Sequence, residues 1–66
     1  MTNQEAANEV FSIIAEKRQD VSNRKHKKRV AERDGYTKNA KMFQKSIDKI
    51  EHSISALSLA YNLLNA

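Results

Sequence analysis

Residues 40–64 read AKMFQKSIDKIEHSISALSLAYNLL, and this stretch decides the fold. Its apolar residues recur at alternating spacings of three and four, without a miss, for more than three heptads. Such spacing places one apolar seam along a single helix, so we predict a helix over about residues 37–65 that packs against a partner helix. The seam residues are Ala40, Phe43, Ile47, Ile50, Ile54, Leu57, Tyr61 and Leu64.

A second helix is predicted upstream of this seam, over about residues 3–34. Thr2 and Glu5 have the spacing of a capping box, in which the Thr hydroxyl accepts from the Glu5 N–H and the carboxylate reaches back to the Thr2 N–H. Asp34-Gly35 supplies the stop, because glycine accepts the left-handed conformation that ends helices. A wide apolar stripe follows the cap, with members Ala6, Ala7, Val10, Phe11, Ile13, Ile14 and Ala15.

Together these helices predict one all-α domain over residues 1–66, an antiparallel helical hairpin with its turn at residues 34–36. Thr37 is the expected N-cap of the second arm. Residues 20–23 include Asp, Ser and Asn, which favour caps over helix interiors. The first arm therefore either runs unbroken or kinks near residues 20–23.

Positive charge is concentrated in the middle of the chain. The sequence has 12 Lys and Arg against 8 Asp and Glu, a net charge of +4. All twelve cations lie between Lys17 and Lys49, where four acids oppose them, so this half carries +8 and the remainder carries −4. Folding at Gly35 brings the positive half to the turn and the acidic half to the end where the termini meet.

A run of consecutive basic residues suggests a polyanion as partner. Residues 24–29 read RKHKKR, a mixture of Arg and Lys suited to phosphate contacts rather than to base reading. Tyr36 at the turn is placed either to stack on a base or to pack against the turn. The basic run is either a solvated face or a nucleic-acid and partner-binding site. The candidate site comprises Lys17, Arg18, Arg24, Lys25, Lys27, Lys28, Arg29, Arg33, Tyr36, Lys38, Lys41 and Lys45.

On a helical wheel, most cations of residues 17–29 share the arc of the apolar stripe, with only Val21 among them. Either their stems lie over the second helix while their heads reach water, or the turn half packs loosely and offers them to a polyanion. In both cases Phe43, Ile47 and Ile50 lack apolar partners within one hairpin. We therefore expect a dimer, a four-helix bundle or coiled coil, with the interface residues Phe43, Ile47, Ile50, Ile54, Leu57, Tyr61 and Leu64.

Composition argues against several classes of function. Without Cys the chain has no disulfide, thiolate metal site or Cys nucleophile. No Ser/His/Asp set or glycine-rich phosphate loop occurs, and a thin hairpin encloses no pocket, so we predict no enzyme, no catalytic residue and no cofactor. Asp48 and His52 are four residues apart, but with Lys45 and Lys49 they form a surface charge lattice rather than a metal site.

Two functions fit these observations. The first is a small cytoplasmic nucleic-acid-binding regulatory protein that contacts the phosphate backbone of DNA or RNA. The alternative is a phage- or plasmid-type inhibitor or adaptor that binds an acidic surface of a host protein complex. A membrane is not an expected partner, because residues 17–29 offer one Val and no aromatic side chain to a lipid interface. The expected cytoplasmic location follows from the lack of a long apolar run or a signal-peptide pattern.

The opening Met1-Thr2 and Gln4-Glu5, with the size of the hairpin, resemble the small plasmid-encoded RNA-binding hairpins that regulate copy number. This resemblance covers only these N-terminal residues, and it implies a four-helix dimer with RNA as its ligand. The basic run at residues 24–29 departs from that family. The likeness is therefore architectural and assigns no family.

Overall fold

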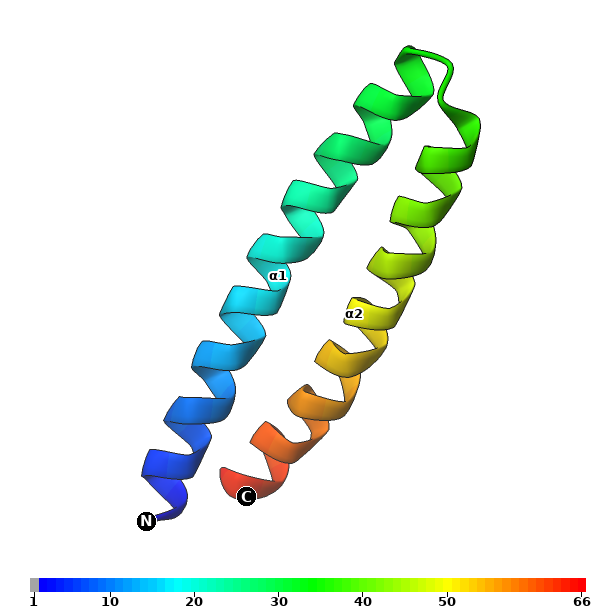
Figure 1. Cartoon of the computed structure of the whole chain (residues 1–66). Helices are drawn as coiled ribbons and strands as arrows, with labels where there is room; N and C mark the ends of the chain where they lie inside the picture. Colours follow the sequence, from blue (N-terminus) through cyan, green and yellow to red (C-terminus); the bar gives the residue numbers. More distant parts are fainter. Residues whose placement is uncertain (1) are drawn as a thin grey trace.

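Two long antiparallel helices make up the structure, a computed structural model that describes residues 2–66 (Figure 1). α1 spans Asn3–Arg33 and α2 spans Thr37–Leu64, so each ends one residue before the expected bound. The molecule measures 49 × 14 × 14 Å. The predicted all-helical hairpin is confirmed, with both termini at one end of a thin rod and the turn at the other (Figure 1).

The start of α1 is capped by its own sequence. The Thr2 hydroxyl accepts a hydrogen bond from the Glu5 N–H at 3.1 Å, as predicted. The Glu5 carboxylate, however, accepts from the Thr2 hydroxyl at 3.2 Å instead of reaching the Thr2 N–H. One hydroxyl thus serves as both acceptor and donor, which satisfies one of the free N–H groups at the helix start.

The turn is a Schellman motif built around Gly35. The Gly35 N–H donates to the Glu32 carbonyl at 3.2 Å, and the Tyr36 N–H donates to the Ala31 carbonyl at 2.8 Å. Gly35 has a φ of +82°, the left-handed conformation that glycine adopts without strain. Because the motif extends to Tyr36, Tyr36 is the N-cap of α2 and Thr37 is its first helical residue, a correction to the expected Thr37 cap.

α1 is one uninterrupted helix through residues 20–23, so of the two alternatives for this arm the unbroken one holds. The polar side chains of this segment bond to neighbours one turn away. Gln19 Nε2 donates to Asn23 Oδ1 at 3.1 Å, and Arg24 Nε donates to Asp20 Oδ1 at 2.9 Å. Side chains occupied in this way do not compete for backbone hydrogen bonds, which explains why the helix continues.

The core is a narrow seam between the two helices. Its fully buried residues are few and mostly small, because a two-helix rod covers only one strip of each helix. The wide apolar stripe expected on α1 is therefore not all core: Phe11 is 55% exposed and Ile13 is 42% exposed. The buried residues are Ala7, Ile14, Val21, Ala31, Ala40 and Ile47.

Ile47 is buried within one hairpin, although the sequence predicts that Phe43, Ile47 and Ile50 lack apolar partners there. Its side chain is only 1% exposed, while Phe43 and Ile50 are half-buried. Arg24 bonds to Ser46, the residue before Ile47, so the aliphatic stem of Arg24 crosses the seam at this level. The stem of Arg24 thus lies over α2 near Ile47.

Candidate nucleic-acid interface

Three cations occupy the seam itself. Lys17 and Arg24 follow Val10 at intervals of seven residues, and Lys28 follows Val21 in the same way. Each therefore takes a heptad position that usually holds an apolar residue. All three are half-buried. Arg24 and Lys28 reach side chains on α2, so for these two the stem lies over the second helix, one of the two arrangements expected from the sequence.

Arg24 connects the two helices while keeping donors for a ligand. Its Nε donates to Asp20 Oδ1 at 2.9 Å, and its Nη1 donates to Ser46 Oγ on α2. The Arg24 side chain stays 36% exposed. Because a guanidinium has five N–H groups, donors remain after these two bonds form. Arg24 can thus hold the hairpin together and contact a phosphate with the same group.

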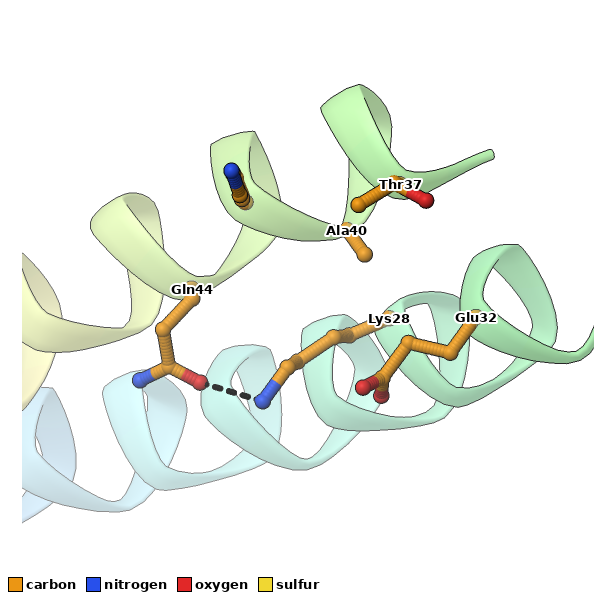
Figure 2. Close-up of a pocket in the computed structure, with 6 residues that line it drawn as sticks. Lys28, Glu32, Thr37, Ala40 and Gln44 are labelled. Carbon is orange, nitrogen blue, oxygen red and sulfur yellow. Dashed lines mark hydrogen bonds between the residues drawn. The ribbon is translucent and has the colours of Figure 1, made fainter. Parts of the chain in front are cut away.

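Lys28 lies in a groove of about 470 Å³ between α1 and α2, near the turn (Figure 2). Its Nζ donates to Gln44 Oε1 at 2.7 Å, and Gln44 Nε2 donates to Asp48 Oδ1 at 2.7 Å. Ala40 faces this groove with a single methyl group, which leaves room beside the Lys28 stem (Figure 2). The groove is also lined by Glu32, Thr37 and Lys41, so it holds charges of both signs.

A second groove near the turn, of about 410 Å³, combines aromatic and basic side chains. Tyr36 is 62% exposed at the tip of the hairpin, and Phe43 is half-buried. Aromatic rings beside a cation can stack an unpaired base while the cation holds its phosphate. The complete lining is His26, Lys27, Val30, Ala31, Asp34, Tyr36 and Phe43.

The other predicted cations are exposed. Two of them make exposed ion pairs: Lys25 Nζ lies 3.8 Å from Glu51 Oε1, and Arg33 Nε lies 3.4 Å from Asp34 Oδ1. Exposed pairs contribute little to stability, so a phosphate can compete for these cations. Within the part of the chain that the structure describes, no ion pair within 4.0 Å involves Arg18, Lys27, Arg29, Lys38, Lys41 or Lys45.

Most exposed cations of α1 share one side: Arg18, Lys25, Arg29 and Arg33 fall within about 80° around the helix axis, and Lys27 lies on the other side. Successive helical residues rotate by about 100°, so Lys27 and Arg29 lie about 160° apart around α1. Lys38 and Lys45 are seven residues apart and share one face of α2. We call residues 17–49, which contain all twelve Lys and Arg, the cationic turn half.

Sequence reasoning placed Phe43 in an oligomer interface and did not find its groove. The groove combines Lys27 of α1, Tyr36 of the turn and Phe43 of α2, and no spacing within one helix brings these three together. The sequence also left open which apolar residues stay exposed. At the end where the termini meet they are Phe11, Ile13, Leu59 and Leu63.

Among the described residues, no group of three or more His, Cys, Asp or Glu side chains is placed to hold a metal ion. Neither α1 nor α2 combines the length and the apolarity that crossing a membrane requires. Comparison of the chain with protein-family models, with curated proteins and with solved structures finds no match. The function must therefore be inferred from the chemistry of the surface.

Proposed function

We propose that this protein is a small cytoplasmic regulator that binds DNA or RNA through the cationic turn half and acts as a dimer. One observation carries the proposal: among the described residues, six exposed cations without an ion pair lie in one half of a rod-shaped molecule. Neutralising phosphates with such cations releases counterions, and that release drives binding without regard to base sequence. The expected ligand contacts are therefore to phosphates.

The arrangement of the cations favours nucleic acid over an acidic protein surface. A folded protein reaches one side of a rod, whereas Lys27 and Arg29 lie on nearly opposite sides of α1. A nucleic-acid strand can bend around the turn and contact both. The groove between Tyr36 and Phe43 adds a place for one unstacked base beside Lys27, which favours a single strand or a strand junction over a regular duplex.

Titration at two salt concentrations tests the proposal. Fluorescence anisotropy would follow binding of a labelled single strand, a short duplex and a structured RNA to the full chain. With six unpaired cations in contact with phosphates, we expect the affinity to fall about 10³-fold between about 50 and about 200 mM salt. If none of the three binds at the lower salt, the proposal is wrong, and an acidic protein surface becomes the better candidate partner.

Paired variants identify the cations that act. Lys27→Ala with Arg29→Ala removes two exposed cations that have no ion pair in the structure, so we expect the slope of log affinity against log salt to fall by about 2. The matched control exchanges the same two residues, Lys27→Arg with Arg29→Lys, and keeps the charge. An unchanged slope in the alanine pair would show that nucleic acid does not contact this part of the rod.

A further inference from the structure

The last fourteen residues of the chain, 53–66, contain no charged side chain, although much of this segment faces solvent. Ala56, Leu59 and Leu63 are exposed and follow one another at spacings of three and four, so they share one face of α2. Leu59 is 63% exposed and Leu63 is 70% exposed. We call Ala56, Leu59 and Leu63 the uncharged outer face of α2, because they lie away from the seam that α2 forms with α1.

The hairpin exposes more surface than a compact chain of the same mass. The chain exposes 5132 Å², whereas a compact monomer of 7.6 kDa exposes about 4,300 Å² by the general scaling of surface with mass. The radius of gyration, 15.1 Å, likewise exceeds the value of about 11 Å for a compact chain of this length. The excess of about 800 Å² comes from the thin rod shape, which leaves apolar side chains such as Leu59 and Leu63 exposed.

A second copy of the same chain fits this face by charge. The acids of the same end, Glu5, Glu9 and Glu16, lie on α1. Glu9 and Glu16 directly precede the seam positions Val10 and Lys17, so they flank the seam on α1, whereas the uncharged outer face is the side of α2 turned away from α1. Two uncharged outer faces can therefore meet without bringing these acids together.

Charge also sets the direction in which two copies pair. Toward the turn, the same outer face of α2 continues as Lys45, Asp48, Lys49 and His52, a row with a net positive charge. A parallel pair would place both rows of lysines side by side, whereas an antiparallel pair centred on Leu59 separates them. His52 and Ala66 each lie seven residues from Leu59, so residues 52–66 of one copy lie along residues 52–66 of the other.

We propose that the uncharged outer face of α2 pairs antiparallel with the same face of a second copy, centred on Leu59. The dimer is then a rod about 75 Å long, from two 49 Å hairpins overlapping by about 21 Å at 1.5 Å per residue. Its two cationic turn halves project at opposite ends. Given the proposed nucleic-acid binding, on which this step rests, one dimer bridges two separate nucleic-acid segments.

Sedimentation of the full chain without nucleic acid tests the pairing alone. We expect the unaltered protein to be dimeric and Leu59→Ser with Leu63→Ser to be monomeric, with the helical circular-dichroism signal kept because both residues are exposed in the single hairpin. Met42→Ser is the matched control, since Met42 is 64% exposed on α2 within the cationic turn half. A monomeric unaltered protein, or a double variant that stays dimeric, would overturn the proposal.

Spin labels on an otherwise unaltered chain test the direction. Because the sequence has no Cys, Lys38→Cys gives a single labelling site near the turn. Lys38 is 21 residues from Leu59, so an antiparallel pair puts the two labels about 60 Å apart at 1.5 Å per residue. Labels within about 25 Å of each other would indicate parallel pairing and contradict the model.

Bridging is measured separately, by capture of a second labelled oligonucleotide on beads that carry the first. We expect the dimer to capture it and the monomeric double variant to bind the bead-held strand without capturing another. Absence of any binding to the first strand would refute the proposed function while leaving the sedimentation result intact. Binding without capture by a dimeric protein would refute the antiparallel arrangement.

Discussion

At Gly35 a single backbone conformation determines where the chain reverses. Of residues 2–66, Gly35 alone has a positive φ, at +82°. No atom lies within 4 Å of the position that a Cβ would occupy, so a side chain there meets no obstacle other than its own backbone. We expect Gly35→Ala to lower the free energy of unfolding by about 1–2 kcal/mol, the cost of a left-handed conformation for an L residue.

Urea unfolding followed by circular dichroism measures this loss. Gly35→Asn is the control, because asparagine tolerates the left-handed conformation better than alanine and often takes the same place in Schellman turns. We expect the asparagine variant to lose less stability. Equal losses for both variants would mean that backbone conformation at this position does not limit the turn.

At the scale of the helices, α2 could be predicted from its own residues and α1 only in part. A strict three-four spacing has one helical solution, so α2 and its seam followed directly. In α1 three seam positions hold cations, and the sequence of α1 alone does not say whether a Lys or Arg stem covers a core. That depends on the residue it meets across the seam, such as Ser46 for Arg24 or Gln44 for Lys28.

The candidate interface, too, could be predicted from the sequence only in part. The basic run was evident because consecutive charges need no partner to be recognised. The two grooves near the turn were not, because each is lined by residues from both helices. Exposed apolar residues were equally hard to assign, since Phe11 lies in the expected core stripe and is nevertheless 55% exposed. Its ring instead lies against Tyr61 of α2, with 6.0 Å between ring centroids.

We expect a cation at a seam position to lower the stability of the hairpin and to add a contact for nucleic acid. Lys28 tests this expectation. Lys28→Met keeps an unbranched stem in the half-buried position but removes the charge. We expect the free energy of unfolding to rise by about 1 kcal/mol, because an apolar methionine end replaces an ammonium group at a half-buried position, while the salt slope for nucleic acid falls by about 1. Lys41 lines the same groove but is exposed, so Lys41→Met is the control and should leave stability unchanged. A destabilised Lys28→Met would show that the bond to Gln44 outweighs apolar contact.

At the scale of the whole molecule, the two halves of the rod leave different groups without partners. The cationic turn half presents unpaired charge, and the end where the termini meet presents apolar surface without charge. A partner that covers the end where the termini meet leaves the cationic turn half exposed. The proposed pairing and the proposed nucleic-acid binding therefore use different residues and do not compete.

If folding and pairing are coupled, the melting temperature of the protein depends on its concentration. If two hairpins unfold together, mass action makes the melting temperature rise with protein concentration. With an unfolding enthalpy near 0.7 kcal/mol per residue summed over two chains, the rise is about 5 °C for each tenfold increase in concentration. Thermal unfolding by circular dichroism over a hundredfold concentration range measures it. Leu59→Ser with Leu63→Ser should melt at one temperature throughout, because a monomer has no such dependence. A melting temperature that is constant for the unaltered chain would show that the hairpin folds alone.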